Sequence, residues 1–422
     1  MKKHAIWNFL LIIPMLASAQ DPALLDLQKC YRAAEAKFSM DEQHNLISHK
    51  NEAQQKVAGS YWQPQVNLNA QATYQSDVVG IPLESPLFEI PTLSKDQYRA
   101  TIDVTQTLYD GGLVHQKKTM SDLQAAVESA SVSSQFYSIY DQIDQLFTGV
   151  LLARQQQLLI YSTKKDLENR KGQLETAYKN GTATAAQVKT LEAEILRLNQ
   201  RMDDARSMEQ GAIRALGQLT GLAIPDDTQL IPPGNAMPGS AELHRPELDL
   251  IDKQIELAQA GEGFSDALVL PRVSAFVQGG YGRPGLNYLV DEFDTFYMLG
   301  VRLNYPLWSG GKNRNEAETW RIQQEQLALQ KQNMSSSFQV LSVRQHEEVN
   351  RLQGVLSTDD QIIALREEVL SSSKVAMDNG TMTAADYARD ANAVLQAKLE
   401  KATHEVQLQQ AILTYQHTLG NH

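Results

Sequence analysis

Two short motifs contain residue types that could do chemistry, and both lack the spacing that the chemistry requires. His346-Glu347-Glu348 has the composition of a metal site, but no second histidine follows four residues later, as a helical zinc motif needs. Gly310-Gly311-Lys312 resembles part of a phosphate-binding loop, but Asn313 occupies the position where that loop has Ser or Thr. The nine histidines form no cluster with a metal-ligand spacing. We therefore expect no catalytic residues, no metal and no cofactor, and a protein that is not an enzyme.

A third group, Asp386 and Asp390, has a spacing with physical meaning. On a helix, residues four apart lie on the same face, so the two carboxylates of this acid pair would act together on cations. The alternative is that both are ordinary acids of a solvated helix face. The helices and turns that position these two carboxylates decide between the two interpretations.

Those elements occur twice. Three motifs in the first half of the chain return in the second half in the same order and at one offset, 310 − 111 = 199 residues. Such a fixed register indicates two copies of one structural unit. The pairs are Tyr109-Asp110-Gly111-Gly112 with Trp308-Ser309-Gly310-Gly311, Asn180–Ala186 with Asn379–Ala385, and Leu219-Thr220-Gly221 with Thr418-Leu419-Gly420.

Long helical hairpins are predicted at 113–220 and 312–419. No proline occurs in these tracts, and both are rich in Gln, Glu, Leu, Ala and Lys, which favour helices. Each hairpin turns at an Asn-Gly pair, which can adopt the left-handed conformation that ends a helix, and a threonine then caps the next helix. The predicted tips are Asn180, Gly181, Thr182, Ala183 and Thr184 in the first copy, and Asn379, Gly380, Thr381, Met382 and Thr383 in the second.

A pair of strands precedes each helical hairpin, at 61–109 and 272–308. Apolar and polar residues alternate along 65–75, 98–109, 273–281 and 297–307, which is the period of a strand with two different faces. The strand near Val273 is the weakest, because Phe276 falls on the polar face and Gly279, Gly280 and Gly282 interrupt it. A helix over 23–58 and a helix starting at Pro246 complete the two copies.

The N-terminal segment and the composition limit the classes of protein to which the chain can belong. Residues 1–19 are typical of a secretory signal peptide, with Lys2 and Lys3 before a short apolar run and Ala17-Ser18-Ala19 as the cleavage site. We divide the rest into a first repeat at 20–221, a Pro- and Gly-rich linker at 222–244 and a second repeat at 245–422. A net charge of −12 argues against nucleic acid as a partner. Cys30 is the only cysteine, so we expect a buried thiol and no internal disulfide.

The alternating strands of an exported protein suggest an outer-membrane β-barrel. Four strands cannot close a barrel, and open edges are not tolerated in lipid, so several chains must contribute. Three chains of four strands would give twelve. The alternative is a soluble periplasmic coiled-coil scaffold. Aromatic residues gather at the strand ends next to the helices, where an interfacial girdle would lie: Tyr61, Trp62, Tyr109, Tyr305 and Trp308.

The chain resembles the TolC family of outer-membrane efflux proteins over essentially the whole mature sequence. The resemblance lies in the order of elements, which occurs twice: helix, strand pair, "YDGG" or "WSGG", long helix, "NGT" tip, returning helix, and "LTG" or "TLG". The resemblance implies a mainly α-helical homotrimer with a twelve-stranded transmembrane barrel, four strands from each chain, and a periplasmic α-helical barrel. It implies a passive exit duct for small molecules in a tripartite efflux pump, located in the outer-membrane lipid, with a periplasmic adaptor at the helical tips and an inner-membrane transporter as the energy source. Type I protein secretion is the alternative within the family.

The resemblance also implies a gate at the periplasmic entrance, narrowed by acidic residues just past the second tip. Asp386 and Asp390 match this position, although Arg389 stands where well-known members have the second acid. An aromatic residue and an arginine that help close the entrance in such members are here Met377 and Met382. The acid pair and the two tips are therefore the candidate site.

Overall fold

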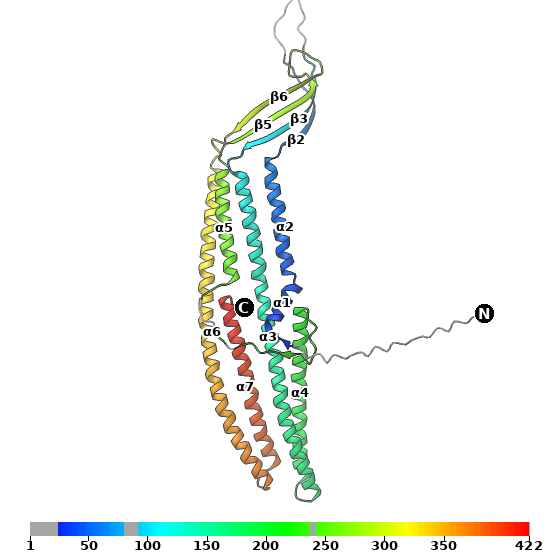
Figure 1. Ribbon diagram of the computed structural model, residues 1–422, viewed down its shortest axis with the longest axis vertical. Coiled ribbons are helices and arrows are strands. Elements are labelled where there is room, and N and C mark those ends of the chain that lie inside the picture. Colours follow the sequence, from blue (N-terminus) through cyan, green and yellow to red (C-terminus); the bar gives the residue numbers. More distant parts are fainter. Residues whose placement is uncertain (1–23, 80–91, 235, 238–241, 422) are drawn as a thin grey trace, which may run out of the picture. The chain divides into compact units, whose positions relative to one another are not determined.

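The structure is a computed structural model that describes residues 24–79, 92–234, 236–237 and 242–421. The predicted signal peptide at 1–19 lies outside these residues. The chain is mainly helical (Figure 1). The helices are α1 (Leu27–Lys37), α2 (Met40–Gly59), η1 (Ser60–Trp62, a 3-10 helix), α3 (Leu113–Lys179), α4 (Ala185–Thr220), α5 (Pro246–Ala267), α6 (Lys312–Asp378) and α7 (Ala384–Leu419). The strands are β1 (Leu24–Leu25), β2 (Gln65–Tyr74), β3 (Asp96–Tyr109), β4 (Gln229–Leu230), β5 (Arg272–Arg283) and β6 (Asp294–Asn304).

Contacts divide the chain into two compact units, each of which draws on both sequence repeats. Unit 1 contains the N-terminal residues up to Phe38, Ile139–Pro238 and Gln345–Tyr415, and therefore holds both helical tips. Unit 2 contains Ser39–Ser138, Gly239–Arg344 and the C-terminal residues from Gln416, and therefore holds all four long strands. The helices α3 and α6 contribute residues to both units.

The long strands of unit 2 form one antiparallel sheet in the order β2-β3-β5-β6 (Figure 1). Leu68 pairs with Ile102, Val104 with Val277, and the ladder shifts register once, between Thr107 and Tyr109. Only β2 and β6 lie at an edge, and within the described residues neither has a partner on its outer side.

The sheet has one apolar and one polar face, as the alternation predicts. The apolar side chains are exposed: Leu68 is 76% and Leu299 is 70% accessible. The same face carries Val66, Ile102, Val277, Tyr297, Val301 and Leu303, each more than half exposed. An exposed apolar surface of this kind on an isolated sheet indicates a surface that another molecule or a lipid phase covers.

The helices of unit 1 pack along an apolar seam. Its fully buried members include Leu167 on α3, Leu191 and Leu198 on α4, and Tyr387 and Leu395 on α7. These positions recur at the spacing of one helix face, so burial against neighbouring helices stabilises the long helices. Among the described residues, no helix combines the length and hydropathy needed to cross a membrane.

Two predicted elements differ in the structure. The helix expected over 23–58 is interrupted, because Ser39 adopts a left-handed conformation (φ 53°) between α1 and α2 and Leu24–Leu25 forms a strand. The buried residues Cys30, Tyr31 and Ala34 fix α1 within unit 1, whereas α2 buries none. The strand expected over 297–307 ends at Asn304, because Pro306 offers no backbone N–H for the ladder.

Candidate functional site

The two helical tips have the same backbone geometry. After α3, the N–H of Gly181 donates to the carbonyl of Tyr178 (3.0 Å) and the N–H of Thr182 to that of Ala177 (2.9 Å). This is a Schellman motif, in which the glycine takes the left-handed conformation, here with φ 75°. After α6, Gly380 (φ 72°) and Thr381 repeat both bonds, to Met377 and Ala376, at 3.0 and 2.9 Å. In both tips the Asn and the Gly are exposed.

The helices that return from the tips begin with related caps. Thr184 and Gln187 form a capping box at the start of α4, as predicted. At the start of α7, the N–H of Asp386 donates to Thr383 Oγ1 (3.2 Å), and that hydroxyl donates to Asp386 Oδ2 (2.7 Å). Asp386 is therefore part of the cap of α7.

A network of four side chains joins α3 to the end of α6 and the start of α7 near the second tip. We call Asp166, Arg170, Asp378 and Tyr387 the tip network. Arg170 Nη1 lies 2.5 Å from Asp378 Oδ1, and its guanidinium lies 5.2 Å from the centre of the Tyr387 ring. The Tyr387 hydroxyl donates to Asp166 Oδ2 at 2.5 Å.

Burial and hydrogen bonds together set the protonation states of Arg170 and Tyr387. The Arg170 side chain is only 5% exposed, whereas Asp378 is 54% exposed. Burial acts to lower the pKa of the Arg170 guanidinium, but hydrogen bonds to Asp378 and Tyr387 raise it overall, so Arg170 stays charged. Burial, together with the Asp166 carboxylate, raises the pKa of Tyr387 to about 12, so its hydroxyl remains a donor at neutral pH.

The acid pair lies on one face of α7, as predicted, but neither carboxylate is free. Arg389 Nη2 lies 3.1 Å from Asp386 Oδ1, and its Nε lies 3.9 Å from Asp390 Oδ1. Ser373 on α6 donates to Asp390 Oδ2 at 2.6 Å. Arg389, with 71% of its side chain exposed, therefore offsets part of the negative charge of the acid pair.

The methionines near the second tip are packing residues in this chain. Met377 and Met382 contact the buried seam that contains Tyr387, Ala384 and Ala388. Flexible thioether side chains fill irregular gaps of this kind.

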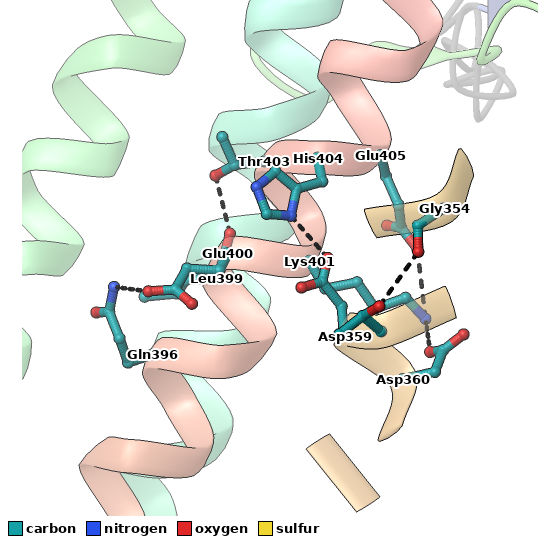
Figure 2. A network of polar contacts seen from close by, with 11 residues as sticks. Gly354, Asp359, Asp360, Gln396, Leu399, Glu400, Lys401, Thr403, His404 and Glu405 are labelled. Atoms are coloured by element: carbon teal, nitrogen blue, oxygen red, sulfur yellow. Dashed lines mark hydrogen bonds and ion pairs between the residues drawn. The ribbon is translucent and has the colours of Figure 1, made fainter. Parts of the chain in front are cut away.

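A clamp of side-chain contacts, which includes two lysine–carboxylate ion pairs and one histidine–aspartate contact, joins α6 to α7 farther from the tip (Figure 2). Lys401 Nζ lies 2.6 Å from Asp360 Oδ1, and His404 Nδ1 lies 2.7 Å from Asp359 Oδ2. Lys398 adds a third cross-helix pair with Glu367, also at 2.6 Å. These contacts lie on one side of α7, three residues apart, and hold α6 and α7 together as one hairpin.

The predicted girdle residues lie at the ends of the strands next to the helices of unit 2. Tyr61 and Trp62 belong to η1, Tyr109 is the last residue of β3, and Tyr305 and Trp308 follow β6. Trp308 is 88% exposed, and all the others except Tyr61 are more than 40% exposed. Lys117 lies 5.8 Å from the centre of the Tyr61 ring.

Sequence reasoning missed the tip network. Its members are separated by 208 residues (Arg170 and Asp378) and 221 residues (Asp166 and Tyr387), and no local pattern links them. A buried arginine on an otherwise apolar stripe is the one signal that could have suggested a partner on another helix.

Known proteins are similar to this chain in sequence and in fold. Residues 237–421 match the family model described as outer membrane efflux protein. The alkaline protease secretion protein AprF of Pseudomonas aeruginosa is 22% identical over 231 residues, which cover 51% of this chain and 47% of AprF. This chain thus spans about half the length of that relative.

Two solved structures are similar over nearly the whole chain. The outer membrane protein VceC of Vibrio cholerae superposes with a TM-score of 0.68 at 16% identity, covering 94% of this chain and 96% of VceC. The open state of the Neisseria gonorrhoeae MtrE outer membrane channel gives a TM-score of 0.66 at 15% identity, covering 94% and 89%. These similarities confirm the predicted mainly helical fold.

Proposed function

We propose that this chain, whose residues 237–421 match the outer membrane efflux protein family, is the outer-membrane exit duct of a tripartite efflux pump that carries small molecules out of the cell. The observation that carries the proposal is the sheet β2-β3-β5-β6, with its exposed apolar face and its two unpaired edges within the described chain. Lipid accepts such a face but not such edges, which require closure into a barrel.

Closure requires further copies of the chain. Four strands are too few for a barrel, whereas three chains would supply twelve strands, enough to surround a pore. In this homotrimer the polar face lines the lumen, and the helical hairpins form a periplasmic barrel below the membrane. The exposed aromatic residues Trp62, Tyr109, Tyr305 and Trp308 suit the membrane–water interface on the periplasmic side of the outer membrane.

The tips are the proposed contact with the rest of the pump. Apart from Met382, which packs against the buried seam, the turns at Asn180–Thr184 and Asn379–Thr383 have short side chains, which allow the helical hairpin of a periplasmic adaptor to approach closely. The adaptor connects the duct to an inner-membrane transporter that supplies the energy. The duct itself is passive.

The gate is proposed to lie beside the second tip. Breaking the tip network would release the α6–α7 hairpin from α3, while the clamp between α6 and α7 keeps the hairpin intact. Three acid pairs around the axis would favour cations at the entrance, less strongly than free carboxylates because Arg389 lies between them.

One measurement tests the duct proposal directly. The mature protein is extracted from outer membranes in mild detergent, and its protein mass is measured by light scattering with the detergent contribution subtracted. A mass of three chains supports the trimeric barrel. A monomer or dimer that is released without detergent would refute it and favour a soluble scaffold.

Type I protein secretion is a second candidate, favoured by the similarity to the protease secretion protein AprF. Deleting the gene distinguishes the two functions. Loss of efflux raises sensitivity to small toxic compounds, whereas loss of secretion removes specific proteins from the medium.

A further inference from the structure

Two phenylalanines lie on the polar face of the sheet, each packed over a glycine of the neighbouring strand. Phe276 on β5 pairs with Gly300, and Phe296 on β6 pairs with Gly280. A Cβ atom at Gly300 would come within 2.9 Å of the Phe276 ring, and one at Gly280 within 2.3 Å of the Phe296 ring. The same Phe-x-x-x-Gly spacing on two antiparallel strands produces both contacts. Aromatic rings stabilise strand glycines in this way, so the glycines serve to lay the rings flat.

A guanidinium lies over each ring. The Cζ atom of Arg302 is 5.1 Å from the centre of the Phe276 ring, and that of Arg99 is 5.6 Å from the centre of the Phe296 ring. Arg99 is on β3, so it reaches β6 across β5, where Gly280 and Gly282 leave its path free of side chains. We call Arg99, Arg302, Phe276 and Phe296 the arginine–phenylalanine platform.

Among the described residues, no carboxylate lies within ion-pair distance of either guanidinium of the platform. Arg302 has no ion pair there, and the polar partner of Arg99 is the Tyr288 hydroxyl at 3.5 Å. Asp103, an acid of the same face, instead accepts hydrogen bonds from Asn69 (2.6 Å) and Gln278 (2.5 Å). The guanidinium groups keep their donors available for a carboxylate.

From this geometry we propose that the platform is a weak binding site for organic anions that carry an aromatic ring. The inference rests on the proposed function, which turns the polar face toward the lumen. The carboxylate pairs with a guanidinium fork, and the ring stacks on the flat surface formed by guanidinium and phenyl groups. A conduit needs a site that binds weakly enough to release its solute, which stacking on an open wall provides. The platform would therefore favour aromatic anions among the exported molecules.

The test uses the purified full-length channel in planar bilayers, with 1-naphthoate as the probe. We expect 1-naphthoate to reduce single-channel current in a concentration-dependent manner, and the neutral analogue 1-naphthalenemethanol to have little effect. In the double variant Arg99→Gln with Arg302→Gln, the half-blocking concentration should rise by at least about tenfold.

Two matched variants separate the platform from a generally positive lumen. Arg302→Lys keeps the charge but removes the planar fork, and Phe276→Leu keeps an apolar side chain but removes the ring. Both should weaken the block if stacking matters, and they decide the question if the double variant does not assemble. Conducting channels with the same block in wild type and these variants would overturn the platform proposal. A wild-type protein that forms no channel would instead refute the proposed function.

Discussion

Arg170→Met is expected to shift the gate toward its open state. Methionine preserves the length and apolar contact of the buried side chain, and Asp378 is exposed enough to be solvated once its partner is lost. Because Asp378 is largely exposed to solvent, the ion pair contributes only about 1 kcal/mol of stabilisation. The contact of the Arg170 guanidinium with the Tyr387 ring contributes about 1 kcal/mol more. If both contacts exist only in the closed state, their loss of about 2 kcal/mol changes the ratio of open to closed channels by roughly thirtyfold.

The assay is single-channel recording in planar bilayers, combined with thermal denaturation. Arg154→Met is the matched control, because Arg154 is also an arginine of α3 with a carboxylate partner, Glu209 at 2.5 Å. Arg154 joins α3 to α4 and to the backbone at 226–228, and not to α6 or α7. Both variants should lose stability, and Arg170→Met alone should open the channel. If Arg170→Met lowers the melting temperature as Arg154→Met does and leaves the open fraction unchanged, the tip network is structural and the gate assignment is wrong.

Three further predictions concern single residues. Arg389→Ala removes the positive charge beside the acid pair, so the reversal potential in a KCl gradient should shift toward that of a more cation-selective channel. An unchanged reversal potential would show that the acid pair does not line the pore. Gly380→Ala places a side chain on a residue with a left-handed backbone conformation and should destabilise the protein by about 1 kcal/mol, whereas Gly354→Ala within α6 should stabilise it. Thermal melting followed by circular dichroism measures both effects. If the two variants melt at the same temperature, the tip glycine does not have this role. Burial, with smaller contributions from nearby carboxylates, raises the pKa of the Cys30 thiol to about 12. At pH 8 an aromatic disulfide reagent should therefore react with this thiol at least about a hundredfold more slowly in the native than in the unfolded protein. Comparable rates would mean that the thiol is accessible in the native protein.

Local chemistry made parts of the fold predictable. Gly181 and Gly380 mark the helix ends because few other residues accept a positive φ there, and the alternation of apolar residues specifies which face of each strand is apolar. The break at Ser39 was not predictable, because no proline or glycine marks it. It depends on the burial of α1, a tertiary effect that overrides the local preference for helix.

Phe276 is a residue whose role could not be predicted from the alternation of one strand. The alternation places it on the polar face, which alone suggests a weak strand. The register of β5 against β6 shows that Gly300 lies opposite, and that Arg302 covers the ring. A residue that breaks the period therefore depends on a pairing that one strand's sequence cannot specify.

The distribution of charged contacts in unit 1 determines which helices would move together. Charges link α6 to α7 repeatedly, through pairs such as Lys401 with Asp360, so this hairpin resists separation. Between α3 and α7 in the same unit, amide side chains away from the tip donate hydrogen bonds, from Gln155 to the Glu405 carboxylate and from Gln410 to the Thr148 hydroxyl. In neither bond are both groups charged, so each is weaker than an ion pair formed by a buried guanidinium. The buried charge of Arg170 is therefore the contact whose loss most favours movement of the whole hairpin away from α3.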